Sequence, residues 1–128
     1  MPNFFPRQEF EYAVKQFNTQ YFFECHDTLE EIWLSAPASE KDFYQGILHM
    51  AVGLYHFDNQ NFKGAVSQLN KAQERLKKFL PQFRGVHLEQ LLNKADPFRL
   101  SAEQRVESGT TTIKIQAFPS IVWDDEEF

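Results

Sequence analysis

Apolar side chains recur every three or four positions along most of this chain, and this spacing constrains the fold more than any other feature. The clearest stripe lies between the turn-forming cluster Asp58–Asn61 and Pro81. Such spacing places the apolar residues on one face of an α-helix, and that face has to be buried against other helices. We therefore predict four main helices separated by short breaks: Pro6–Phe17, Thr19–Leu34, Ser39–Asp58 and Phe62–Leu80.

The pattern is less regular after Pro81. Val86–Ala95 is typical of a shorter helix that ends at Asp96 and Pro97, and Ser101–Gly109 is typical of another. Thr110–Ile115 is β-branched and partly alternating, so it predicts either a short strand or an extended arm. Phe118–Trp123 is too short to fold alone, and we expect it to pack on the helical body or on another subunit.

These elements together predict an all-α fold. We expect a compact bundle of antiparallel helical hairpins, with about four main helices, one or two short ones and an extended C-terminal arm. A length of 128 residues fits a single helical domain, 1–128, with its motif-bearing core at about 8–80 and the short helices and arm at 81–128. The 14 phenylalanines supply large apolar areas for the core.

Charge and composition exclude several classes of protein. The formal charge is −6 over residues 1–60 and +5 over residues 61–123, within a net charge of −5. This balance disfavours a nucleic-acid partner, and the two complementary halves favour packing within the chain or between subunits. The longest apolar stretch, about 46–57, is too short to span a membrane. We expect a cytoplasmic protein, because Cys25 is the only cysteine and no signal-peptide pattern opens the chain.

Polar residues interrupt the apolar stripe of the second predicted helix. His26, Glu30 and Trp33 are spaced so that they share one helical face with Phe22 and Leu29, and we expect this face to point to the core. The adjacent Cys25 is turned about 100° away from His26, so the two cannot act on one substrate. A buried or half-buried thiol is the expected role of Cys25.

The third predicted helix carries a matching polar stripe of Gln45, His49 and His56 within one narrow sector. The short connection makes these two helices antiparallel neighbours. We therefore expect Gln45 to approach Glu30 or Trp33, and His56 to approach Phe22 or His26, with His49 between them. The candidate ligand-binding set is His26, Glu30, Gln45, His56 and Trp33.

Three interpretations of this cluster remain open. It can be a hydrogen-bonded network that holds the helices in register. It can bind a small-molecule ligand or a divalent metal such as Zn, Ni or Fe, with His26, Glu30 and His56 as metal ligands and His49 as a further possibility. It can also support metal-free acid–base chemistry, with Glu30 orienting His26 as the base. The spacing places no nucleophile, so no catalytic residue is assigned.

Small residues in the third and fourth helices suggest a different class of function. Gly53, Ala65 and Ala72, with Leu69 between the alanines, match the spacing of a tetratricopeptide-like hairpin, although no second copy follows. The alternative function is therefore a protein-interaction or self-association module in which the His/Glu cluster is structural. A homo-oligomer formed through the aromatic C-terminal arm is one version of it.

The spaced motif residues also carry a family resemblance. Asn18, Phe22, His26, Leu29, Glu30 and Trp33, followed by Tyr44-Gln45-Gly46-Ile47 and His56, resemble the domain-of-unknown-function 309 family over about residues 8–80. The resemblance implies a compact all-helical fold. It implies no established reaction, substrate or cofactor.

Overall fold

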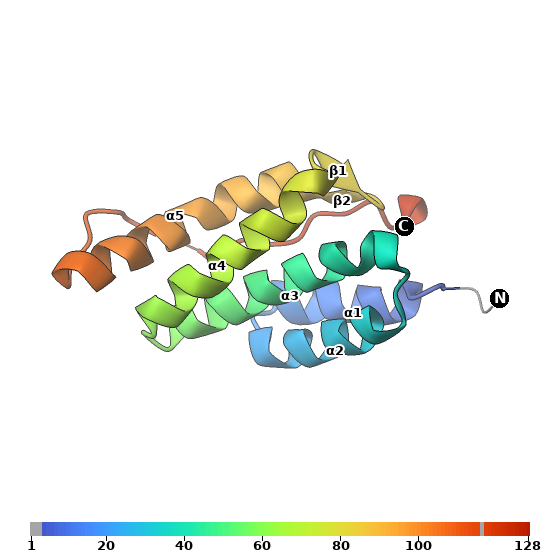
Figure 1. Cartoon of the computed structure of the whole chain (residues 1–128), viewed down its shortest axis with the longest axis horizontal. Coiled ribbons are helices and arrows are strands. Elements are labelled where there is room, and N and C mark those ends of the chain that lie inside the picture. The colour runs from blue at the N-terminus through green and yellow to red at the C-terminus, as the bar shows by residue number, and fades with distance from the viewer. Residues whose placement is uncertain (1–3, 116) are drawn as a thin grey trace.

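Helices make up most of the computed structural model, which describes residues 4–115 and 117–128 (Figure 1). Within this part the α-helices are α1 (Arg7–Asn18), α2 (Phe22–Ser35), α3 (Ala38–Asp58), α4 (Phe62–Leu76) and α5 (Leu88–Ser108). Two 3-10 turns, η1 (Lys77–Phe79) and η2 (Asp125–Glu127), and a small hairpin of β1 (Gln82–Phe83) and β2 (Val86–His87) complete the described elements. The four main helices are confirmed, except that α4 ends at Leu76 and passes into η1.

The helices pack as successive hairpins around α3. α3 contacts α2 on one side and α4 on the other, α1 packs against α2, and α5 packs against α4 (Figure 1). The all-helical bundle is therefore confirmed. None of the described helices is long and apolar enough to cross a membrane.

The α3–α4 hairpin is closely packed because small residues face large ones. A Cβ atom added at Gly53 would lie 2.7 Å from the side chain of Leu69, which is buried. A Cβ atom at Gly46 would lie 2.5 Å from Leu76 Cγ. Asn61 begins α4 by accepting a 3.1 Å hydrogen bond from the Gly64 N–H at its side-chain oxygen. The close packing expected from the small residues is confirmed.

The prediction of two short helices after Pro81 is wrong, because α5 continues through Pro97. Proline removes one intrahelical hydrogen bond, but packing can offset this cost. Phe98 and Ala102 are buried after the proline, and Ala95 is buried before it. The Arg99 side chain also bonds Asp96 at 2.8 Å and Glu103 at 3.0 Å, and these contacts support the helix around the proline.

The hairpin between α4 and α5 is a feature that the sequence pattern did not predict. β1 and β2 pair antiparallel, with Phe83 opposite Val86. Arg84 and Gly85 form the turn with φ values of 48° and 77°. Positive φ at both central residues is typical of a two-residue hairpin turn.

The residues after α5 return along the bundle. Residues 110–115 form no regular strand, so the predicted strand is absent there. Val86 and Trp123 form an isolated β-bridge, and the rings of Trp123 and Phe128 lie 5.2 Å and 4.6 Å from the ring of Phe10. Ile121 is buried in the core. This segment therefore packs on the helical body of its own chain.

Candidate functional site

The predicted site residues of α2 lie beside its core face and not on it. The buried residues of α2 are Phe22, Cys25, Leu29 and Ile32. His26 is half-buried, with 26% of its side chain exposed, and the Glu30 side chain is 54% exposed. The prediction of a core-facing stripe is confirmed for Phe22 and Leu29, which are buried, and Trp33 packs against the core while partly exposed. It is wrong for Glu30, which is exposed, and His26 is only half-buried. α2 buries the sector of Cys25, Leu29 and Ile32 between α1 and α3, and this leaves His26 and Trp33 at the border of the buried surface.

The polar stripe of α3 lies on the outer side of that helix. Gln45, His49 and His56 are all half-buried, whereas the apolar stripe of Phe43, Ile47, Met50, Ala51 and Leu54 is buried. Within this stripe His49 reaches α4, whereas Tyr55, which lies beside the stripe, reaches α2. The stripe therefore forms a surface between two neighbouring helices, and not part of the core.

His49 is held by a residue of α4. Its Nδ1 lies 2.7 Å from Gln68 Oε1, and an amide oxygen can only accept a hydrogen bond, so the ring N–H is assigned to Nδ1. Nε2 then carries the free lone pair, and it is buried without a hydrogen-bond partner among the described residues. Burial lowers the pKa of His49, the bond to Gln68 opposes this shift, and charges on Arg75, Lys71 and His26 lower the pKa further. The imidazole is therefore neutral at neutral pH.

His26 has one nitrogen near a carboxylate and one without a hydrogen bond. Nε2 lies 3.5 Å from Glu30 Oε2, one turn along α2. Nδ1 lies 3.2 Å from Asp27 Oδ1, but the two groups are not aligned for hydrogen bonding, so Nδ1 stays buried and unpaired among the described residues. A charge on His26 contributes to lowering the pKa of His49, which lies on the neighbouring helix.

Trp33 and Gln45 occupy the other end of the same surface. The Lys41 ammonium donates to the backbone oxygen of Trp33 at 2.7 Å and lies 4.4 Å from the centre of its ring. The indole Nε1 is buried and has no hydrogen-bond partner among the residues described. Gln45 is half-buried, and its amide makes no hydrogen bond within the described part of the chain.

The contacts of His56 lie on the α4 side. Its Nδ1 is 3.3 Å from the side-chain nitrogen of Asn61, in the turn before α4. His56, near the end of α3, was expected to approach the start of α2. Tyr55 makes this contact instead, and its ring centre lies 5.5 Å from that of Phe23. The antiparallel register is therefore correct, but the residue that faces α2 there is the neighbour of His56.

These contacts bear on the three interpretations of the cluster. A purely structural network satisfies its polar atoms, yet buried nitrogens of His26, His49 and Trp33 are unpaired among the described residues. In that same part of the chain, no group of three or more His, Cys, Asp or Glu side chains is placed to hold a metal ion. A metal site here would therefore have fewer than three of these side chains as ligands and would need further ligands from outside the chain. Cys25 is buried and its thiol donates to the Ala13 carbonyl, so it is no nucleophile for this surface.

Sequence reasoning did not include Gln68, which fixes the ring of His49. The sequence could have indicated Gln68 as a candidate, because it is a polar residue next to Leu69 on a helix that was expected to pack against α3. The partner of His49 could be found only after the α3–α4 register was known. Phe23 and Tyr55 were missed for the same reason, since they meet only in the folded chain.

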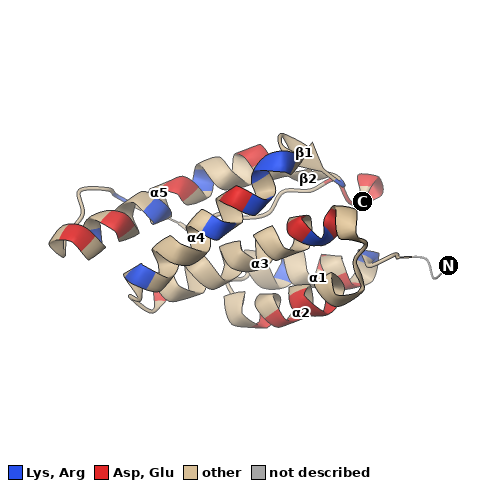
Figure 2. Ribbon diagram, in the orientation of Figure 1, with Lys and Arg blue, Asp and Glu red and all other residues tan. Residues whose placement is uncertain are grey.

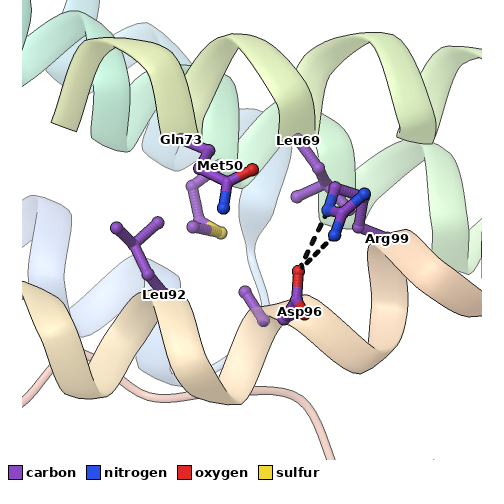
Figure 3. Close-up of a pocket in the computed structure, with 7 residues that line it drawn as sticks. Met50, Leu69, Gln73, Leu92, Asp96 and Arg99 are labelled. Carbon is purple, nitrogen blue, oxygen red and sulfur yellow. Dashed lines mark hydrogen bonds and ion pairs between the residues drawn. The ribbon is translucent and has the colours of Figure 1, made fainter. Parts of the chain in front are cut away.

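A hollow lined by α3, α4 and α5 is not a second site. Met50, Leu69, Gln73, Leu92, Asp96 and Arg99 line it, with Arg99 directed at Asp96 (Figure 3). The volume open to the centre of a water molecule is about 10 Å³. This is room for about one water molecule, so the hollow cannot admit a substrate.

Comparison with known proteins identifies the region that holds the histidines. Residues 10–68 match the family model described as "Domain of unknown function (DUF309)". This region is therefore similar to the DUF309 family. The matched region contains α2, α3 and the start of α4, and therefore all of the site residues described above, with Gln68 as its last residue.

The comparisons bring no established function. The uncharacterized protein YpuF of Bacillus subtilis (strain 168) is 39% identical to this chain over 62 residues. The match covers 48% of this chain and 36% of YpuF, so this chain spans only about a third of that relative. No solved structure gives a significant match.

Proposed function

We propose that the surface between α2 and α3 binds a divalent transition metal, with His26 and His49 as the two protein ligands. One observation carries this proposal. His26 Nδ1 and His49 Nε2 are buried imidazole nitrogens on neighbouring helices, and neither has a hydrogen-bond partner among the described residues. A buried polar atom without a partner is costly unless something outside the chain satisfies it.

The surroundings of the two rings support the proposal. A metal-binding histidine commonly donates its other ring N–H to an oxygen, which orients the ring and raises the basicity of the metal-binding nitrogen. Gln68 Oε1 has this position beside His49, and Glu30 Oε2 has it beside His26. Glu30 is therefore assigned the role of orienting His26, and not that of a metal ligand.

The protonation state of His49 also fits a metal. Only neutral imidazole binds a metal ion, and burial keeps the pKa of His49 below its usual value. Imidazole ligands suit Zn, Ni or Fe. Two protein ligands leave coordination positions open for water or for a small-molecule ligand. Trp33 Nε1, which has no partner among the described residues, is available to hydrogen-bond such a ligand, and the half-buried Gln45 is the second candidate.

The experiment is a calorimetric titration of the metal-free full chain with zinc or nickel chloride. We expect a saturable site of about one metal per chain. His26→Gln and His49→Gln weaken binding by about a hundredfold or more, and Glu30→Gln weakens it by about tenfold.

Two matched variants serve as controls. His56→Gln and His87→Gln each remove an imidazole while leaving the proposed pair in place. Affinity that is unchanged in His26→Gln and His49→Gln, or that falls equally in His56→Gln, contradicts the proposal. The second of these outcomes would show that the two-histidine site is wrong and that His56 contributes as much as His49.

The cytoplasm is the proposed location of the protein. Cys25 is a buried free thiol, and thiols remain reduced in that compartment. Fractionation of cells that express the tagged chain tests the location.

A further inference from the structure

We infer that Phe23 and Tyr55 form a docking surface for a basic segment of another protein. The inference goes beyond metal binding, because it concerns the exposed aromatic rings at one end of α2 and α3. We call these two residues the aromatic patch.

The aromatic patch is exposed although its two rings contact each other. Phe23 is 52% exposed and Tyr55 is 37% exposed, and their ring centres lie 5.5 Å apart. The ring of His26 lies 5.9 Å from that of Phe23, and the ring of His56 lies 5.9 Å from that of Tyr55. A single exposed aromatic residue is ordinary, whereas adjoining exposed rings on neighbouring helices are typical of interaction surfaces.

The helices that carry the patch are acidic. α2 contains Glu24, Asp27, Glu30 and Glu31 and has no Lys or Arg. After Asp42, the only formally charged residue of α3 is Asp58. Figure 2 shows acidic residues along α2 with no basic residue among them. A partner for this surface is therefore expected to be positively charged.

Elsewhere in the chain, Lys and Arg side chains lie over aromatic rings. Lys41 lies over Trp33 at 4.4 Å, Arg84 over Phe128 at 4.9 Å and Arg105 over Phe62 at 4.9 Å. Among the described residues, no Lys or Arg lies over Phe23 or Tyr55. A Lys or Arg side chain from another protein would supply the missing cation, with Asp27, one turn along α2 from Phe23, near its charge.

A second copy of the chain is a weaker fit for the same surface. The basic residues at the end of α4 and in η1 include Arg75 and Lys78, and both already hold Asp42. A contact between these residues and α2 would also be head-to-tail, and such contacts propagate into open assemblies unless they close into a ring.

The test uses a synthetic dodecapeptide of alternating Arg and Gly, with a Glu–Gly peptide of the same length as the matched acidic probe. Binding to the full chain is followed by backbone NMR shifts and by fluorescence anisotropy at several salt concentrations. We expect saturable, salt-sensitive binding of the Arg–Gly peptide alone, with the largest shifts around Phe23 and Tyr55.

Variants then separate the aromatic patch from simple charge attraction. Phe23→Leu and Tyr55→Leu keep an apolar side chain but remove the ring, and each should raise Kd by about threefold or more. Asp27→Asn should also weaken binding. Tyr12→Leu is the control, because Tyr12 is 58% exposed on α1 and should leave Kd unchanged.

Several outcomes overturn the inference. These are no saturable binding, equal binding of the acidic peptide, an effect of Asp27→Asn without any effect of the Leu variants, or an equal effect of Tyr12→Leu. Self-association that Phe23→Leu abolishes in light scattering would assign the patch to a second copy instead. Metal affinity is measured in Phe23→Leu as well, so that failure of the docking surface and failure of the metal site are distinguished.

Discussion

Asn18 and Ile121 are 103 positions apart and share two hydrogen bonds. The Asn18 side-chain nitrogen donates to the Ile121 carbonyl at 3.1 Å, and the Ile121 N–H donates to the Asn18 side-chain oxygen at 2.7 Å. The amide therefore satisfies both backbone groups of a buried residue in the C-terminal segment. Asn18 belongs to the spaced motif, and its role in this structure is to position that segment.

Asn18→Ala should lower the free energy of unfolding by about 1–2 kcal/mol, because it removes both hydrogen bonds and leaves the backbone of Ile121 unpaired. Urea denaturation measures the change. Asn70→Ala, on the exposed side of α4, is the matched control. An equal loss in the two variants would show that the link to Ile121 contributes nothing.

Gly53→Ala should also destabilise the protein. Alanine favours a helix by about 1 kcal/mol over glycine, but the new methyl group meets Leu69, and overpacking costs about 1–3 kcal/mol. Leu69 is buried and its backbone nitrogen is 3.2 Å from the new Cβ, so it has little room to move.

Thermal unfolding of Gly53→Ala, Leu69→Ala and the double variant measures this clash. The double variant should lose less stability than the sum of the two single losses, because Leu69→Ala removes the obstructing side chain. Ser67→Ala on α4 is the control. Strict additivity would contradict the proposed close contact.

Cys25 should be unreactive in the folded protein. Burial raises the pKa of its thiol to about 12 from a usual value of 9.0, and only the thiolate reacts. A disulfide reagent should label it slowly at pH 8 and quickly in urea.

The same pKa shift predicts a dependence of stability on pH. The folded state favours the neutral thiol, so this contribution is fully present below pH 9 and is lost as the pH rises towards 12. Cys25→Ala lacks this dependence. The difference in free energy of unfolding between wild type and Cys25→Ala should therefore shrink above pH 9.

Gln68→Ala should lower the pKa of His49 further, because the hydrogen bond that His49 donates to Gln68 opposes the effect of burial. NMR titration of the imidazole measures the pKa, and Gln73→Ala is the control on the same helix. An increase in the His49 pKa on loss of Gln68 would contradict the assigned contact.

Protonation of His49 should also lower the free energy of unfolding in acid. Its folded-state pKa lies below the usual value of 6.5, so the unfolded chain binds the proton more readily. The contribution is fully present above pH 6.5 and is lost as the pH falls through the folded-state pKa. His49→Gln should remove this part of the acid dependence.

The local spacing of apolar residues predicted the main helices well, because the apolar residues of an amphipathic helix lie three and four positions apart. It failed at Pro97, where tertiary packing of Phe98 and Ala102 supports a helix that the proline alone would end. It also failed at the β1–β2 hairpin, whose strands of two residues are too short to leave a pattern.

The candidate site was predicted less completely. Trp33 does contact α3, through Lys41, but His49 contacts Gln68 of α4 and His56 contacts the turn before α4. The buried face of α2 was predicted only in part, because residue spacing locates a helical face only approximately. The helices that pack against α2 decide which part of that face is buried.

The amino-acid sequence by itself determined the all-helical fold, the order of the main helices and the two polar stripes, since each depends on residues close together in the chain. The tertiary structure decided which nitrogens of His26 and His49 are left unpaired, that Gln68 holds His49 and that Asn18 holds Ile121. These relationships depend on side chains that lie 19 and 103 positions apart, and packing alone brings them together.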